Sequence, residues 1–203
     1  MNDLLNKIAE NFRRFPGIGP RQAKRFVYYL LHQGASEIDA LIKSLEQLKK
    51  SVARCGDCQR YFPLNNFQPT KLCANCQDPM RDESTLLVVE KDVDLENVER
   101  SGTYHGRYFI LGGGRNGTDA DALHGKRLME LKRQIADEYG GRVDEIVLAL
   151  NPTAYGDIAL ESIVKDLQPF AVAISQLGRG IPMGGEIEFA DEDTLREALK
   201  RRS

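Results

Sequence analysis

Histidine and cysteine are scarce in this chain of 203 residues, and their scarcity limits the chemistry that the chain can perform. The three histidines, His32, His105 and His124, do not lie beside a nucleophile motif. All four cysteines belong to one paired motif, which leaves no thiol free. Covalent catalysis needs a nucleophile that is activated by an adjacent base. The sequence therefore gives no support to a hydrolase of that class.

Long hydrophobic runs are absent as well. A membrane-spanning helix needs about 20 predominantly apolar residues in succession, and no run in this chain approaches that length. The opening Met1-Asn2-Asp3 does not begin a secretory signal. The composition, 41% hydrophobic and 29% charged, is that of an ordinary soluble protein. We therefore expect a cytoplasmic protein without a membrane partner.

The four cysteines form two pairs of identical spacing, Cys55-Gly-Asp-Cys58 and Cys73-Ala-Asn-Cys76. Two such knuckles supply the four thiolates of a tetrahedral zinc site, and residues 59–63 can return the chain as a small ribbon. Disulfides or unrelated buried thiols are the alternatives, but paired motifs in a cytosolic context favour metal. Because four sulfur ligands leave no position for a catalytic water, we expect one structural Zn²⁺ per chain.

Charge is unevenly distributed along the chain. Residues 1–54 carry ten Lys or Arg against five Asp or Glu, whereas residues 81–203 carry sixteen against twenty-three. This asymmetry predicts one surface for an anionic partner and another surface for a different partner.

The basic N-terminal segment has the apolar spacing of three helices, which begin near residues 3, 20 and 36. Pro20 suits the first turn of the second helix, where a missing N–H costs nothing. Gly34 is expected to end that helix. Ser36, with Asp39 three residues later, resembles a capping box that opens the third helix.

The turn between the first two helices, residues 16–20, has the sequence Pro-Gly-Ile-Gly-Pro. Its glycines would let backbone amides approach a phosphate, and the second helix would offer its positive N-terminal end. Ile18 would fill the core between the helices. The pattern resembles the helix-hairpin-helix motif of DNA-repair proteins, although a plain helical turn is the alternative because Gly-x-Gly alone is weak evidence. We expect the DNA-binding residues to be Gly17, Gly19, Arg21, Lys24 and Arg25.

Downstream of the cysteines, short apolar runs alternate with amphipathic ones, which predicts a mainly parallel sheet covered on both faces by helices. The strands are expected at residues 84–90, 107–111, 144–150 and 170–175, with a last strand at 186–189 and a helix from residue 191 onward.

Two further patterns in this region suggest a ligand. Residues 112–117 fit GxGxxG, but they follow the second strand, and Asp137, about twenty residues later, lies in a helix. We therefore expect no bound nucleotide. Glu90, Asp92, Asp94 and Asp157 could hold Mg²⁺ for phosphoryl transfer, but the Asp-x-Asp pair follows the wrong strand. The ligand count argues against Mg²⁺ and favours solvated acids or a docking surface for a partner.

The order of the motifs is specific. The hairpin, the paired cysteines, a strand ending in Glu90, and the blocks at residues 99–108, 151–153 and 180–191 follow one another along the whole chain. In this order the chain resembles the bacterial RecR family of recombination mediators.

The resemblance implies an α+β fold of several domains: a helix-hairpin-helix segment at residues 1–53, a four-cysteine zinc finger at 54–80, a Toprim-type α/β domain at 81–176 and an oligomerisation tail at 177–203. The family forms dimers and ring-like tetramers, acts in association with the nucleoid and is not regarded as an enzyme. It works with RecO, and in many bacteria RecF, to load RecA onto single-stranded DNA coated by SSB.

The family's basic DNA contacts fall here on Arg21 and Arg25, and its Toprim acids, which contact RecO, fall on Glu90 and Asp157. Where relatives usually show Glu-Gly-Glu, residues 155–157 read Tyr-Gly-Asp, so one acid is missing. One hairpin neutralises few phosphates and would bind DNA weakly, so we expect several hairpins on a closed oligomer to act together. A Mg²⁺-dependent Toprim nuclease or primase-like enzyme and a zinc-ribbon adaptor for proteins remain the alternatives.

Overall fold

The computed structural model describes residues 2–64, 71–112, 118–150, 152–178, 181 and 184–200. The chain divides into two compact units, one formed by Met1–Val52 with Pro63–Asn66 and the other by Ala53–Phe62 with Phe67–Ser203. Among the described residues, no helix has both the length and the apolar character needed to cross a membrane.

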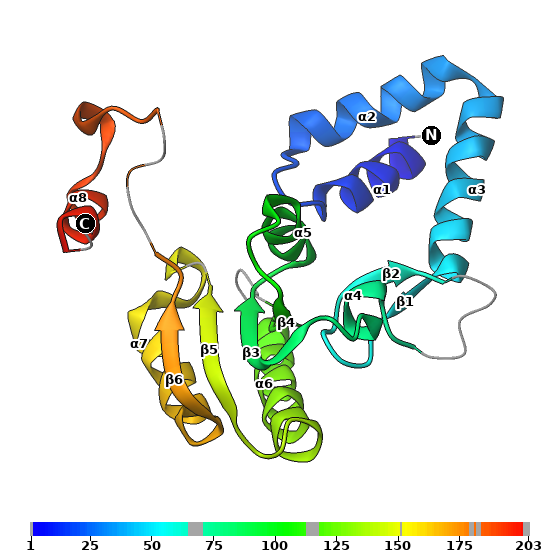
Figure 1. The fold of residues 1–203 in the computed structure, drawn as a ribbon. Helices are drawn as coiled ribbons and strands as arrows, with labels where there is room; N and C mark the ends of the chain where they lie inside the picture. The colour runs from blue at the N-terminus through cyan, green and yellow to red at the C-terminus, as the bar shows by residue number, and fades with distance from the viewer. Residues whose placement is uncertain are drawn as a thin grey trace. The chain divides into compact units, whose positions relative to one another are not determined.

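The first unit consists of three helices, α1 (Asn2–Arg13), α2 (Pro20–Gln33) and α3 (Ala35–Ser51), shown in blue and cyan in Figure 1. Two alanines and a valine form the buried centre, because their small side chains let α1 and α2 pack closely: Ala9, Ala23 and Val27. Ile18, in the turn, packs against this centre as predicted.

The boundaries of these helices agree with the sequence prediction except at one cap. Pro20 occupies the first turn of α2, and Gly34 ends that helix with a φ of 89°. Gly34 is also the N-cap of α3, and no side-chain hydrogen bond to this cap is present among the described residues. The predicted capping box at Ser36 is wrong, because Ser36 already lies inside the first turn of α3 and cannot act as its N-cap.

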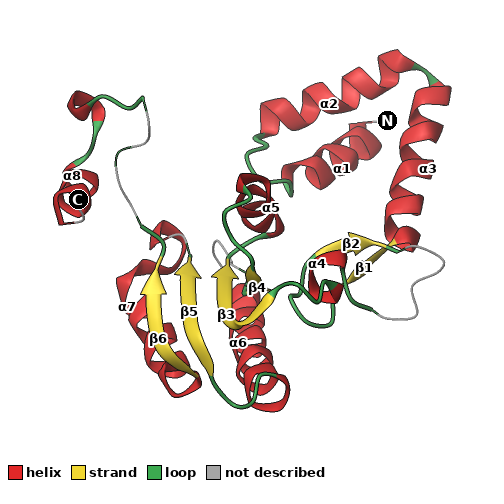
Figure 2. Cartoon of the chain, in the orientation of Figure 1, coloured by secondary structure: helices red, strands yellow, loops and turns green. Residues whose placement is uncertain are grey.

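The second unit is built on a sheet of four parallel strands in the order β4-β3-β5-β6 (Figure 2). The strands are β3 (Asp82–Val89), β4 (Gly106–Ile110), β5 (Val143–Ala149) and β6 (Ala171–Gln176). In the register of the sheet, Val88 lies opposite Phe109 on one side and Leu148 on the other. The predicted parallel sheet is therefore confirmed.

One face of the sheet packs against two helices, α6 (Thr118–Glu138) and α7 (Pro152–Leu167). Successive strand residues point to opposite faces, so Leu86 and Val88 belong to this core, whereas Leu87 and Val89 belong to the other. The core against the helices is completed by Phe109, Leu111, Leu128, Leu131, Ile135, Val143, Ile146, Leu148, Leu150, Leu160, Ile163, Leu167 and Ala171.

The other face packs against the cysteine-containing segment and a helix, α5 (Asp92–Ser101). The cysteine segment comprises a two-stranded ribbon, β1 (Val52–Arg54) with β2 (Tyr61–Pro63), and one helical turn, α4 (Ala74–Gln77). This confirms the predicted ribbon.

The C-terminal part departs from the prediction at residues 186–189. The alternation of Glu and apolar residues predicted a strand, but Ile187–Phe189 forms a 3-10 turn, η2. None of the described strands is hydrogen-bonded to it, and an alternating pattern cannot form a strand without a neighbouring ladder. The predicted final helix is present as α8 (Glu192–Lys200), and the Asp191 carboxylate accepts a hydrogen bond from the Thr194 amide at 2.8 Å. A second 3-10 turn, η1 (Gln168–Phe170), precedes β6.

Candidate metal centre and nucleic-acid interface

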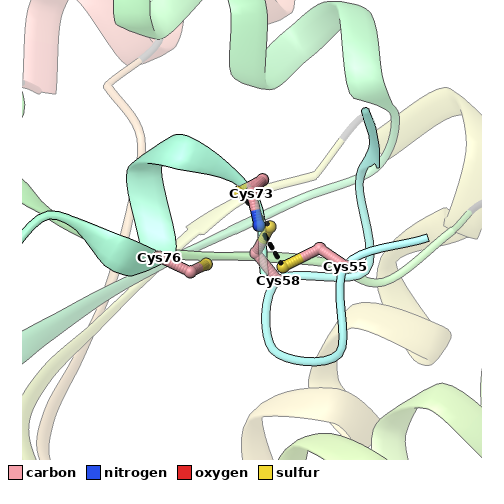
Figure 3. Close-up of side chains that lie close together, drawn as sticks. All are labelled: Cys55, Cys58, Cys73 and Cys76. Carbon is pink, nitrogen blue, oxygen red and sulfur yellow. Dashed lines mark hydrogen bonds between the residues drawn. The ribbon is translucent and has the colours of Figure 1, made fainter. Parts of the chain in front are cut away.

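The four cysteine side chains converge on one point (Figure 3). Their sulfur atoms all lie within 4.8 Å of one another, and those of Cys58 and Cys73 are 3.6 Å apart. Zinc–sulfur bonds of about 2.3 Å in a tetrahedron place neighbouring sulfurs about 3.8 Å apart, and the Cys58–Cys73 pair lies close to this separation. The thiols are free, since a disulfide would require about 2.05 Å. The cluster therefore has the geometry to hold a metal ion.

Each knuckle is held by backbone hydrogen bonds. In the first, the Cys55 amide donates to the Arg60 carbonyl at 2.8 Å, and Gln59 reverses the chain with a φ of 67°. In the second, Cys73 is the N-cap of α4, and its carbonyl accepts a hydrogen bond from the Cys76 amide at 3.1 Å. The Cys73 amide also donates to the Cys55 sulfur at 3.3 Å, and such a bond stabilises negative charge on a ligand.

The electrostatics of the cluster favour a cation. Hydrogen bonds with Cys58, Cys73 and Cys76 lower the pKa of Cys55 far below the ordinary value of a thiol. The hydrogen bond with Cys55 has the opposite effect on its partner and raises the pKa of Cys58. Protein groups alone thus favour a mixture of thiol and thiolate, because several buried negative charges repel one another. A divalent metal ion would neutralise this repulsion and allow all four sulfurs to bind as thiolates.

The cluster is part of the core of the second unit. Cys55, Cys58 and Cys73 are buried in the same apolar cluster as strand residues of β3 and β4. The Ile110 amide, at the end of β4, donates to the Cys58 carbonyl at 2.8 Å. This packing could not be predicted from the sequence, because the spacing of the cysteines indicates which side chains come together but not the surface against which the ribbon lies.

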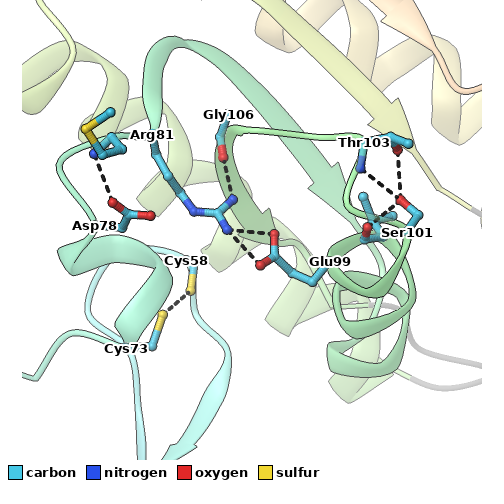
Figure 4. Close-up of polar contacts among 10 residues, drawn as sticks. Cys58, Cys73, Asp78, Arg81, Glu99, Ser101, Thr103 and Gly106 are labelled. Carbon is cyan, nitrogen blue, oxygen red and sulfur yellow. Dashed lines mark hydrogen bonds and ion pairs between the residues drawn. The ribbon is translucent and has the colours of Figure 1, made fainter.

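A partly buried arginine at the start of β3 joins α5 to β4 (Figure 4). Arg81 donates to both carboxylate oxygens of Glu99, at 2.8 and 2.7 Å, and to the Gly106 carbonyl at 3.1 Å. Its guanidinium carbon also lies 5.3 Å from the centre of the Tyr108 ring. A second arginine, Arg107, donates to the Cys76 carbonyl at 2.8 Å. These contacts give a structural role to the block at residues 99–108.

Gly106 lies at the most crowded point of this junction. A Cβ atom at this position would collide with the side chains of Thr85 and Tyr104, and it would lie 2.7 Å from the Thr85 carbonyl oxygen. Only glycine fits where β4 begins beside β3.

The acidic residues predicted at the ends of the strands do not share one site, because each of the described ones has its own contacts. Glu90 is buried and lies 3.0 Å from the ammonium group of Lys91, beside a cavity of about 310 Å³. Asp92 accepts a hydrogen bond from the Tyr61 amide at 2.7 Å, and Asp94 accepts one from the Lys91 amide at 2.9 Å. In the described part of the chain, the cysteines form the only group of three or more potential metal ligands.

Two predicted features of this region fall outside the described residues. The side chain of Asp157 is one, although the backbone at this position belongs to α7. The other is the glycine-rich stretch from residue 113 to residue 117.

The hairpin turn has the conformation that its glycines suggested. Gly17 has a φ of 79°, which favours glycine, and Gly19 is the N-cap of α2. Apart from the residue itself and its chain neighbours, no described atom lies within 4 Å of the Cβ position of either glycine, so a ligand could approach this turn closely. No side-chain hydrogen bond caps the start of α2 in the described structure.

The three predicted basic residues follow this turn on α2. Arg21, Lys24 and Arg25 are exposed, and none of them forms an ion pair with a described residue. Their charge is therefore free to meet an anionic partner.

The comparisons with known proteins cover most of the chain. Residues 5–49 match the family model "RecR, helix-hairpin-helix", residues 84–178 match "Toprim domain", and residues 180–203 match "RecR, C-terminal". Recombination protein RecR of Magnetococcus marinus is 39% identical over 201 residues, which cover 98% of this chain and 94% of the relative. The proteins of the same name from Legionella pneumophila subsp. pneumophila and Frankia casuarinae are 37% and 34% identical, and each alignment covers at least 98% of this chain and 96% of the relative. The chain therefore belongs to the RecR family of recombination proteins.

Proposed function

We propose that this protein is a non-enzymatic recombination mediator in DNA repair. In this role it would form an oligomeric clamp on DNA and, with RecO and RecF, promote the loading of RecA onto single-stranded DNA coated by SSB. The observation that carries the proposal is the uncapped start of α2, where an open glycine turn precedes exposed cations without ion-pair partners, in a chain of the RecR family.

DNA binding at this site would not depend on base sequence. Backbone amides at the turn and the side chains of Arg21, Lys24 and Arg25 would contact phosphates, which carry no sequence information. A single hairpin neutralises few phosphates and binds weakly at physiological salt. Several hairpins in one dimeric or tetrameric ring would add their contacts through high effective concentration.

The four cysteines would hold one structural Zn²⁺ per chain. Four thiolates at this spacing suit zinc, and the burial of Cys55, Cys58 and Cys73 shields the centre from solvent on their side. We propose no Mg²⁺ in the Toprim domain, since Asp92 and Asp94 each accept a backbone hydrogen bond in the fold. Glu90 and Asp157 are proposed as contacts for RecO.

We propose that four segments of the chain have separate roles. Residues 1–53 would bind DNA, residues 54–80 would hold the metal, residues 81–176 would receive protein partners, and residues 177–203 would support oligomerisation. The excess of acidic residues in residues 81–203 would keep that part away from DNA and available to proteins.

The test is a titration of labelled DNA followed by fluorescence anisotropy at several salt concentrations. The double substitution Arg21→Ala with Arg25→Ala should weaken binding about tenfold and lower the slope of log affinity against log salt by about two. The matched control is Lys49→Ala with Lys50→Ala, which removes the same charge from exposed positions on α3. Unchanged affinity in the α2 variant, or equal losses in both variants, would reject the proposed site.

Enzymatic activity is tested separately. We expect no cleavage of single-stranded or duplex DNA in the presence of Mg²⁺ or Mn²⁺. Cleavage that disappears on substitution of Glu90→Gln would instead support a Toprim nuclease.

A further inference from the structure

The basic face of α2 also carries aromatic side chains that the core does not use. Tyr28 and Tyr29 are 55% and 60% exposed, although they lie on the same helix as the buried Ala23 and Val27. Burial of a tyrosine stabilises a fold far more than exposure does. Two adjacent exposed tyrosines are therefore better explained by a ligand than by packing within this unit.

The spacing of the exposed residues places cations and rings on one face. Arg21, Arg25, Tyr28 and His32 are separated by four, three and four residues, which is the spacing of a single helical stripe. All four are exposed. The stripe is about 16 Å long at 1.5 Å per residue, which is long enough for more than one nucleotide.

A groove follows this stripe. Its volume is about 540 Å³, and it is lined by Gln22, Arg25, Phe26, Tyr28, Tyr29 and His32. The lining therefore combines a cation, aromatic rings and two further polar side chains.

The charge of the helix indicates an anionic occupant. The sequence of α2 contains no acidic residue, and its arginines and lysine form no ion pair in the described structure. A purely apolar partner would leave these cations without compensation. A polyanion that also has flat rings would satisfy both features of the surface.

We infer that this face of α2 is a base-stacking surface for single-stranded DNA, with Tyr28 and Tyr29 as the stacking residues. Arg21 and Arg25 would hold the phosphates, while unpaired bases stack on the tyrosine rings beside His32. Proteins that bind single strands without sequence preference combine a basic track with aromatic rings in this way. In a duplex the base faces are already stacked, so the tyrosines would favour single strands over duplex. This inference rests on the proposed role of α2 in DNA binding.

The test compares an oligothymidylate with a duplex of equal length by fluorescence anisotropy. The double substitution Tyr28→Ala with Tyr29→Ala should weaken single-strand binding about tenfold and change duplex binding by less than about twofold. The salt slope should not change, because no charge is removed. Tyr28→Phe with Tyr29→Phe should retain the affinity, since phenylalanine keeps the ring.

A matched control is Tyr61→Ala. Tyr61 is also a largely exposed tyrosine, at 58%, but it lies on β2 in the other unit. Its removal should leave both affinities unchanged.

The chain contains no tryptophan, so tyrosine emission can be observed directly. Binding of oligothymidylate should quench part of this emission in the wild-type protein, and the quenched part should be lost in the phenylalanine variant even though that variant still binds.

The outcomes separate this inference from the proposed function. If Arg21→Ala with Arg25→Ala weakens binding but the tyrosine-to-alanine variant does not, the DNA site stands and the stacking surface is rejected. If neither variant weakens binding, both are rejected. Equal losses of affinity for single strand and duplex in the tyrosine-to-alanine variant would also overturn the inference. So would a fall in the oligomer mass of this variant measured by light scattering, because the tyrosines would then lie between copies of the chain.

Discussion

The two units of this chain bury their side chains to very different extents. In the first unit the buried centre consists of Ala9, Ala23 and Val27, and no side chain of α3 is fully buried. In the second unit both faces of a parallel sheet are covered, one by α6 and α7 and the other by α5 and the cysteine segment. Stability rises with buried apolar area. The comparison therefore assigns most of the stability to the second unit and leaves the first unit with surface for partners.

The exposed side chains of the first unit support this division. Along α3, four large apolar residues are between 41% and 59% exposed: Leu41, Ile42, Leu45 and Leu48. The second unit does bury large side chains, among them Phe109, Leu131 and Ile146, which are fully buried, whereas the buried centre of the first unit holds only alanine and valine.

The largest expected effect comes from the metal ligands of the second unit. Cys73→Ser should abolish metal binding and destabilise this unit by more than about 4 kcal/mol, because metal binding and folding are coupled. Elemental analysis should find one zinc per chain in the wild-type protein and none in the variant. Circular dichroism should show that the variant loses its cooperative thermal transition. The helices of the first unit contain no metal ligand and should retain their signal.

A chelator provides the control for this experiment. EDTA should lower the melting temperature of the wild-type protein and leave the circular dichroism signal of the Cys73→Ser variant unchanged. Purified native protein without zinc, or a melting temperature that does not respond to EDTA, would contradict the metal assignment.

A smaller effect is expected at the crowded junction of β3 and β4. Gly106→Ala should lower the free energy of unfolding by about 2–3 kcal/mol, because the added methyl group meets Thr85 and Tyr104 and the surrounding core cannot yield freely. Urea denaturation measures this change. The control is Gly125→Ala in α6, where no described atom lies within 4 Å of the Cβ position, and this substitution should stabilise the helix by about 0.5–1 kcal/mol.

The smallest expected changes in the free energy of unfolding come from breaking one ion pair in each unit. Glu99→Gln should cost about 1–2 kcal/mol, because it weakens two hydrogen bonds from Arg81 at a largely buried junction. Glu10→Gln breaks the pair with Arg13, whose side chains are 46% and 63% exposed, and should cost less than about 0.5 kcal/mol. Equal costs in urea denaturation would show that the two units do not differ in this respect.

Local periodicity was sufficient to predict the helices and the parallel strands, because apolar spacing directly reflects which side of an element is buried. The paired cysteines likewise identified the four thiols that converge on one point in the structure. The strand predicted at residues 186–189 failed, because an alternating pattern does not reveal whether a neighbouring strand exists. Ser36 failed as a cap, because Gly34 supplied the chain reversal two residues earlier.

Other parts of the site depend on contacts between distant residues and could not be read from spacing. The bonds from Arg81 to Glu99 and from the Ile110 amide to Cys58 join positions that share no local pattern. The tyrosines of α2 did have a signal, since Tyr28 follows Arg21 by seven residues on one helical stripe. This spacing becomes informative only once Ala23 and Val27 are known to lie on the buried face of α2.

The packing of the cysteine segment on the sheet has a consequence for protein engineering. Deleting residues 53–80 would remove the four cysteines, expose Leu87 and Val89 to water, and leave the Ile110 amide without its carbonyl acceptor. The shortest fragment able to fold around this sheet must therefore start upstream of Cys55. Hybrids that exchange this segment between relatives would need to transfer the side chains that meet β3 and β4 along with the cysteines.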